Sequence, residues 1–274
     1  METFPPAKHT KLRPNADRAD GARAVRAARL QRPLLPDISM PVGEFRLASL
    51  YCPCETLCGN FYDLAWRGDC AMLLVAEVMG HGVEAALISM LAKAVFVETA
   101  GETSDPRALL AGMRARLHRL MPDRAFVAAA AARLPFEGAA IELANAGLPH
   151  PFVLRSGGRR VQDVPLEGVP MGLFLDQDPE PATAAVVRLN PGDVLLLASD
   201  GSGAFEGRDG PLFQNARLLR MLERDARCSG SALIDGLTAP LAGFGQVTSV
   251  PGDLNLISVC RRIDARPPQG AWNP

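Results

Sequence analysis

The sequence contains no run of about 18 to 20 uninterrupted apolar residues, the length that a membrane-spanning helix requires. Its first twenty residues also lack the apolar core of a secretory signal peptide. We therefore predict a cytoplasmic protein with no membrane segment. Basic residues are not massed beside aromatic ones, and the formal net charge is only −1 at pH 7, which argues against nucleic acid as the principal ligand.

A zinc site is poorly supported, because no second cluster of Cys or His completes a tetrahedral set. Three of the six cysteines, Cys52, Cys54 and Cys58, crowd into one segment of the chain. We predict that the cysteines are small reduced thiols in a reducing compartment. The other three are Cys70, Cys228 and Cys260.

The length of 274 residues, with 48% hydrophobic and 22% charged residues, predicts one folded domain with a short N-terminal extension. We expect a disordered lead-in over residues 1–14 and a helix with its linker over 15–38. The domain itself is expected over 39–264, followed by a disordered tail over 265–274. No internal repeat is present.

The N-terminal helix is predicted from Asn15, a plausible cap, to Gln31, with Pro33 ending it. A narrow apolar stripe runs along it, while its arginines stay in water. Such a helix is suited to docking on another surface, so we expect a weak homodimer through residues 15–32. The stripe consists of Ala22, Val25, Ala28 and Leu30.

Apolar periodicity changes from Phe45 onward, where short apolar runs separated by turns predict adjacent strands. A strongly apolar helix is expected after Gly82, and a second one with Asp105 as cap and Pro106 in its first turn. Further strands follow, then helices over residues 216–226 and 229–244, then a last strand over 254–262. This block order predicts an α+β sandwich of mostly antiparallel sheets with helices layered outside.

Polar and acidic residues fall at several predicted strand ends, each close to a glycine: Asn60, Glu77, Asp200 and the pair Gly252 and Asp253. Loops converge at strand ends, and glycines let the backbone approach a ligand closely. Carboxylates in such places are how hard cations such as Mg²⁺ and Mn²⁺ are usually held.

Six motifs in order resemble the SpoIIE/RsbU-like protein phosphatases of the PPM, or type 2C, superfamily. They are CGNFYD, VAEVMGHGVEAALISML, LANAGLPHP, GVPMGLF, LNPGDVLLLASDG and GDLNLISV, and the resemblance covers roughly residues 27–262. It implies an α-β-β-α sandwich of two mostly antiparallel sheets flanked by helices. It also implies two Mn²⁺ or Mg²⁺ ions and hydrolysis of phosphoserine or phosphothreonine by a metal-bound water, without a phosphoenzyme.

The resemblance also assigns the metal ligands, and this sequence departs from the family at three of them. The aspartate of the family's Gly-Gly-Asp-Phe-Tyr-Asp falls on Asn60, and that of Asp-Val-Ser-Gly-His-Gly falls on Glu77, with Val78 offering its carbonyl. The aspartate of Ser-Asp-Gly is kept as Asp200, whereas the first one of Asp-Asp-Ile-Thr falls on Gly252. Two carboxylates thus replace four.

The sequence also suggests roles for several residues beside the ligand positions. Asp253 could replace Gly252 as a ligand only through a bulge or a register change, since adjacent strand residues point to opposite faces. Asp63 either supports the site by hydrogen bonds or caps its own turn. Structural or supporting roles are expected for His81, His150, Gly201 and Gly252.

Two functions therefore remain open. One is a SpoIIE/RsbU-like phosphatase, with full or impaired activity, that acts on a phosphorylated small regulatory protein of the STAS-type anti-sigma-factor-antagonist kind. The other is a catalytically degenerate pseudophosphatase that acts as a regulatory protein-binding module. Metal binding separates the two.

Overall fold

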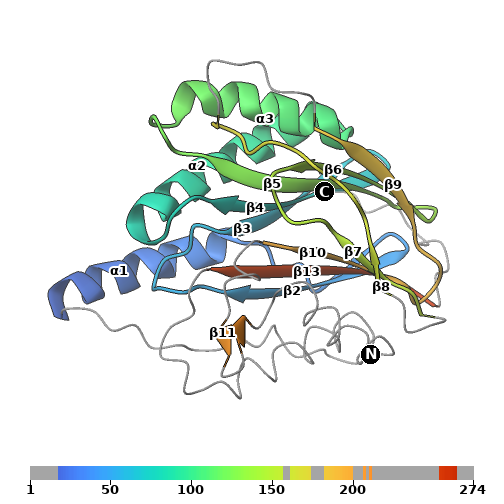
Figure 1. The fold of residues 1–274 in the computed structure, drawn as a ribbon, viewed down its shortest axis with the longest axis horizontal. Coiled ribbons are helices and arrows are strands. Elements are labelled where there is room, and N and C mark those ends of the chain that lie inside the picture. The colour runs from blue at the N-terminus through green and yellow to red at the C-terminus, as the bar shows by residue number, and fades with distance from the viewer. Residues whose placement is uncertain are drawn as a thin grey trace.

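The computed structural model describes residues 18–156, 161–173, 182–199, 206–207, 210–211 and 253–263. Two antiparallel sheets stack face to face, and helices cover the outer face of one of them (Figure 1). This arrangement confirms the predicted α+β sandwich. The two further helices expected over 216–226 and 229–244 lie outside the described residues, as do the lead-in and the tail.

Both sheets are built from strands that are far apart in the chain. The six-stranded sheet has the order β1 (Pro41–Val42), β2 (Phe45–Cys52), β13 (Leu254–Arg261), β10 (Val194–Ala198), β7 (Phe152–Leu154) and β8 (Val161–Asp163). The five-stranded sheet has the order β3 (Phe61–Arg67), β4 (Cys70–Val78), β5 (Val127–Pro135), β6 (Ala140–Ala146) and β9 (Ala184–Arg188). A small pair, β11 (Glu206–Gly207) and β12 (Gly210–Pro211), is separate.

Helices α2 (Gly82–Ala100) and α3 (Pro106–Leu120) pack on the five-stranded sheet. The predicted start of α3 is confirmed, because the Asp105 carboxylate accepts the backbone N–H of Arg107 over 2.8 Å and Pro106 stands in the first turn. None of the described helices combines the length and apolarity that a membrane crossing requires.

Two hydrophobic layers hold the fold together, one between the sheets and one between the five-stranded sheet and the helices. Strand β5 serves both layers with alanines, since Ala128 and Ala130 face the other sheet while Ala129 and Ala131 face the helices. Small side chains there let a helix pack close to the strand backbone. The alternating run of alanines is therefore a packing feature.

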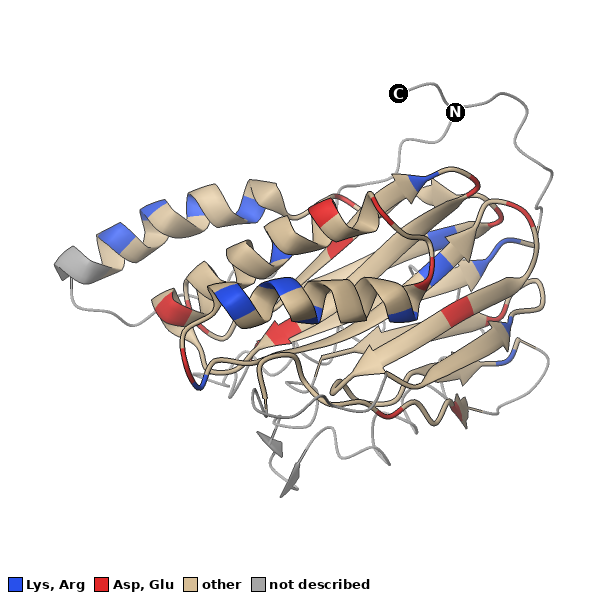
Figure 2. Ribbon diagram, turned by 90° about the horizontal axis from the view of Figure 1, so that it is seen from above, with Lys and Arg blue, Asp and Glu red and all other residues tan. Residues whose placement is uncertain are grey.

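Helix α1 (Arg18–Gln31) runs into a short 3₁₀ turn, η1 (Arg32–Leu34), and contacts α2. Two residues of the predicted apolar stripe, Val25 and Leu30, are 36% and 75% exposed in the single chain, so their docking on another surface stays a prediction. The helix instead turns a face of alanines toward the domain, with Gln31 buried at its end. Its outer face is basic, as the blue segments along α1 show (Figure 2).

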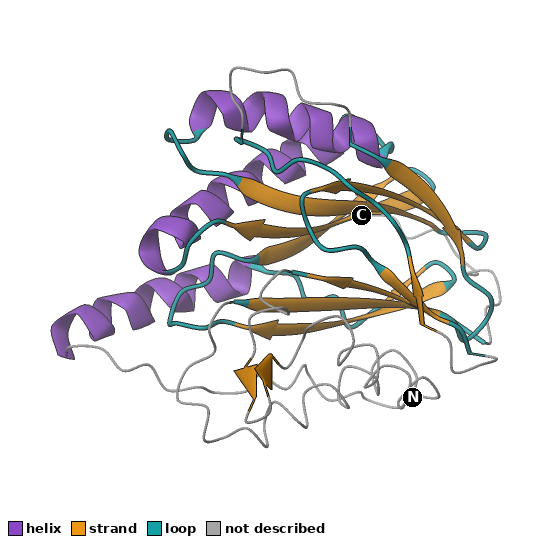
Figure 3. Ribbon diagram, viewed as in Figure 1, coloured by secondary structure: helices purple, strands orange, loops and turns teal. Residues whose placement is uncertain are grey.

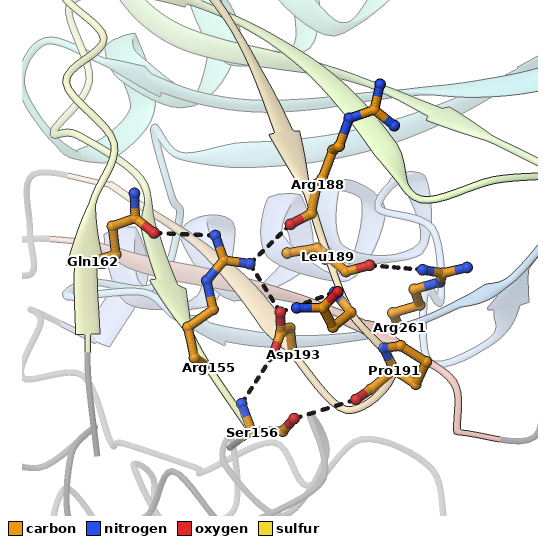
Figure 4. Close-up of polar contacts among 9 residues, drawn as sticks. Arg155, Ser156, Gln162, Arg188, Leu189, Pro191, Asp193 and Arg261 are labelled. Carbon is orange, nitrogen blue, oxygen red and sulfur yellow. Dashed lines mark hydrogen bonds and ion pairs between the residues drawn. The ribbon is translucent and has the colours of Figure 1, made fainter. Parts of the chain in front are cut away.

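The turn between β9 and β10 is held by Asp193, which is 1% exposed. Its carboxylate accepts the backbone N–H groups of Ser156 and Asn190 and pairs with Arg155 over 2.8 Å (Figure 4). Arg155 also donates to the Arg188 carbonyl and to Gln162. These contacts explain the LNPGDV motif as a structural turn at one end of the sandwich.

Candidate functional site

The end of the sandwich opposite Asp193 gathers the strand ends that the sequence singled out. Asn60 directly precedes β3, and Glu77 and Val78 are the last residues of β4. Continuing the register of Phe61 with Ala76 by one residue places Asn60 opposite Glu77. Both then face the space between the sheets, as their neighbours Tyr62 and Val75 do.

The backbone of β4 approaches the residues before β3 closely at this end. A Cβ atom on Gly59 would lie 3.3 Å from the Val78 carbonyl oxygen and 2.9 Å from the Ala85 side chain. The absence of a side chain at Gly59 therefore lets the loop before β3 lie against the turn after β4 and the start of α2 (Figure 3).

Asn60 joins the two sheets. Its side-chain Nδ2 donates to Ser199 Oγ over 3.0 Å and to the Asp253 carbonyl oxygen over 2.9 Å. Ser199 directly follows β10, and Asp253 directly precedes β13. Asp200, Gly201 and Gly252 are their chain neighbours and lie outside the described residues.

Asp253 uses both carboxylate oxygens within the protein. Oδ1 accepts the backbone N–H of Cys54 over 2.8 Å, and Oδ2 accepts that of Gly59 over 2.7 Å. The side chain is 5% exposed. Asp253 thus closes the loop from Cys54 to Gly59, a role that the sequence did not suggest.

Ser199 and Asn255 complete a buried polar network that sequence reasoning missed. The Ser199 N–H donates to the Asn255 carbonyl over 2.9 Å, and Ser199 Oγ accepts the Asn255 N–H over 3.0 Å. With its amide oriented to satisfy both neighbours, Asn255 accepts the Phe61 N–H over 3.2 Å. The available signal was the polar Asn255 inside the mostly apolar strand segment LNLISV.

The motifs LANAGLPHP and GVPMGLF meet beside this end as structural parts. Asn145 bonds the Leu148 backbone in both directions, at 2.7 and 3.0 Å, and fixes the turn after β6. A Cβ atom on Gly168 would lie 2.0 Å from the Asn145 carbonyl oxygen, so only glycine fits there. Arg114 on α3 donates to the carbonyl groups of Val169 and Pro170 and holds the second motif in place.

Comparison with known proteins decides the family. The sequence profile of the Stage II sporulation protein E (SpoIIE) family matches residues 67–262, well over half of the chain. The chain belongs to the SpoIIE family. The SiaA-PP2C domain of Pseudomonas aeruginosa matches with a TM-score of 0.76 and 25% identity, over 89% of this chain and 97% of that one.

Two other solved structures share the SpoIIE-type fold. The RsbU and RsbW domains of Rv1364c from Mycobacterium tuberculosis match with a TM-score of 0.68 and 23% identity, over 84% of this chain and 63% of that one. The PP2C phosphatase domain of SpoIIE from Bacillus subtilis, solved with a fragment of its regulatory domain, gives 0.63 and 15%, over 81% and 65%. Because their sequence identities to this chain are only 23% and 15%, these two matches support a shared fold alone.

The SpoIIE family is metal-dependent, and the contacts of Asn60 and Asp253 determine which of their atoms could coordinate two cations in this chain. The two hydrogen bonds from Asn60 Nδ2 leave only the uncharged Oδ1 of Asn60 as a donor, and both oxygens of Asp253 already accept N–H groups. Among the described family positions, a cation would meet Asn60 Oδ1, the Glu77 carboxylate and the Val78 carbonyl, of which only Glu77 is charged, and the described residues contain no metal-binding group of three or more His, Cys, Asp or Glu. The described part of the site therefore does not fit a two-ion centre.

The remaining sequence candidates lie around the site rather than in it. Asp63 is on the helix side of β3, where it pairs with Lys93 of α2 and accepts the Leu64 N–H. His81 precedes α2 and lies at the rim, with Nδ1 2.8 Å from Glu55 Oε1. His150 lies after β6, with its ring Nδ1 3.2 Å from an oxygen of Asp163.

Proposed function

We propose that this SpoIIE-type domain recognises a phosphorylated small regulatory protein at the open end of its sandwich and hydrolyses the phosphoserine or phosphothreonine of that protein only slowly. Its main action is then that of a regulatory protein-binding module. The observation that carries the proposal is the pair of hydrogen bonds from Asn60 Nδ2 to Ser199 and Asp253. Through them the two sheets are joined by protein groups at the place where the family uses a carboxylate.

Charge balance supports slow hydrolysis. The four acidic ligand positions of the family are occupied here by Asn60, Glu77, Asp200 and Gly252, of which two are acids. Two carboxylates leave two divalent cations poorly neutralised, and repulsion between the ions falls off only slowly in a partly buried site. Phosphate monoesters are among the slowest esters to hydrolyse without such ions.

The proposed partner is based on the domains that occur together with similar domains in other proteins. One solved neighbour is a protein that carries an RsbU domain together with an RsbW domain. For this chain we propose a STAS-type anti-sigma-factor antagonist, or a protein of similar size that carries a phosphorylated side chain. The proposal includes weak self-association of this chain through residues 15–32.

A second candidate is an active phosphatase that uses Mn²⁺ or Mg²⁺. It is favoured by the position of Glu77 and the Val78 carbonyl at the end of β4, where the family places its bridging aspartate and a carbonyl ligand. Asp200, retained in the sequence, would supply the other carboxylate.

Binding and turnover measured together separate these functions. The chain is titrated with a STAS-type domain in its phosphorylated and unphosphorylated forms, with Mn²⁺ or with a chelator, and phosphate release is followed in parallel. We expect preferential binding of the phosphorylated form that survives the chelator, with slow phosphate release. Fast phosphate release that needs Mn²⁺ and is lost in Asp200→Asn would favour the second candidate. A chain that binds neither form of the STAS-type domain and releases no phosphate would refute both.

A further inference from the structure

Two buried aspartates occupy equivalent places at opposite ends of the six-stranded sheet. Asp193 directly precedes β10, and Asp253 directly precedes β13, its antiparallel neighbour. Each accepts two backbone N–H groups, which come from Ser156 and from Asn190 of its own turn for Asp193, and from one loop distant in the chain for Asp253. They differ in that Asp193 is paired with Arg155, whereas no described Lys or Arg forms an ion pair with Asp253.

The two backbone N–H groups that bond to the Asp253 carboxylate come from one short loop. Cys54 and Gly59 lie at its two ends, and the carboxylate bridges them. Two backbone groups of the loop therefore converge on one side chain, which makes the loop conformation depend on it.

Asp253 also fixes Asn60 by two routes. Its side chain holds Gly59, the residue before Asn60, and its backbone carbonyl accepts the Asn60 amide directly. The same loop carries Glu55, which reaches His81 beside the turn that follows Glu77. The loop thus forms one lip of the candidate site, and the turn after β4 forms the other.

We propose that Asp253 is a positioning residue that holds the Cys54–Gly59 loop as a preformed lip of the site and keeps Asn60 facing Glu77 without help from a cation. The lip then contributes to the surface that meets the partner protein. That last point rests on the proposed function, whereas the anchoring of the loop does not.

The loop is tested through the reactivity of Cys54. Cys54 is a half-buried free thiol at the start of the loop, next to the N–H that Asp253 accepts. In Asp253→Asn the loop loses the charged group that holds the N–H groups of Cys54 and Gly59, so Cys54 should become more accessible and its alkylation by iodoacetamide should accelerate severalfold. The labelled cysteine is identified by fragment mass spectrometry.

Asp193→Asn is the matched control, since it removes an equally buried loop anchor at the far end of the sheet. Cys54 should react in this variant as it does in the unmodified chain. Equal acceleration in both variants would indicate general loosening and overturn the proposal. So would an Asp253→Asn variant that loses Mn²⁺ affinity while Cys54 reacts at its original rate, because Asp253 would then be a metal ligand.

Hydrogen exchange on the unmodified chain provides a test that does not depend on a variant folding. The amides of Cys54 and Gly59 should exchange more slowly than that of Glu55 between them, and equally fast exchange of all three would overturn the anchor. If the proposed function holds, Asp253→Asn also weakens binding of the phosphorylated partner, with partial rescue by Asp253→Glu. A chain that binds no phosphoprotein refutes the proposed function and leaves the labelling and exchange results standing.

Discussion

The side-chain amide of Gln31 bonds both backbone polar groups of Cys58. Nε2 donates to the Cys58 carbonyl over 2.7 Å, and Oε1 accepts the Cys58 N–H over 3.1 Å. Ser89 of α2 adds a longer contact of 3.4 Å to the same carbonyl. The last residue of α1 is thereby tied to the loop that leads into Asn60, so the N-terminal helix and the candidate site share one buried junction.

We expect Gln31→Leu to destabilise the protein by about 1–3 kcal/mol, because a side chain of similar size leaves the buried N–H of Cys58 without its partner. Denaturant unfolding measures the change. Arg29→Leu on the exposed face of the same helix is the control and should stay within about 0.5 kcal/mol of the unmodified chain. Equal unfolding midpoints for the two variants would contradict the buried junction.

Restoring the family's carboxylates should act as a unit. The triple variant Asn60→Asp, Glu77→Asp and Gly252→Asp is expected to bind Mn²⁺ far more tightly than the unmodified chain, while each single change returns little. Asn60→Asp alone should lower stability, since a carboxylate cannot donate to Ser199 and Asp253 as the amide does. Titration calorimetry measures the affinity for Mn²⁺, and thermal unfolding measures the stability of the Asn60→Asp variant. Tight binding of two ions by the unmodified chain would refute the prediction.

Acid should release the Asp193 turn. Burial alone raises the pKa of Asp193, but the N–H groups of Ser156 and Asn190 and the charge of Arg155 outweigh it and hold the pKa below its ordinary value of 3.8. A depressed folded-state pKa gives stability that is present above the unfolded-state pKa and is lost as pH falls through the folded-state value. The unfolding free energy should therefore drop below about pH 4, and the drop should be smaller in Asp193→Asn; the same acid sensitivity in both would contradict this assignment.

The fold was largely predictable because its signals are local. Alternating apolar runs marked the strands, and Asp105 with Pro106 marked the start of α3. The face by which α1 packs on its own domain did not follow from the sequence, because apolarity pointed to Val25 and Leu30, whereas close approach to α2 favours small alanines. Helix propensity and hydrophobicity alone do not report how near the partner surface lies.

The sequence indicated which of the described strand ends lie together, but not how their side chains are bonded. Register brings Asn60 and Glu77 together as the motifs suggested. The roles of Ser199, Asn255 and Asp253 depend on contacts between strands that are remote in the chain, 139 residues apart for Asn60 and Ser199. A single sequence carries no signal for which buried polar groups will meet, so the hydrogen-bonded network could emerge only from the structure.

Self-association through residues 15–32 should be weak and should strengthen with salt. Val25 and Leu30 are exposed on α1 and offer an apolar contact, and at about 25 cal/mol per Å² two such side chains supply only a few kcal/mol. Arginines line the same outer face, so two copies repel one another at low ionic strength. Sedimentation should show a dimer fraction that grows with protein concentration and salt and is reduced in the double variant Val25→Ser and Leu30→Ser. This variant leaves Gln31 in place and so keeps the junction with Cys58, whereas deleting the helix would disturb both at once. A double variant that sediments as the unmodified chain does at every salt concentration would show that α1 packs only within its own chain.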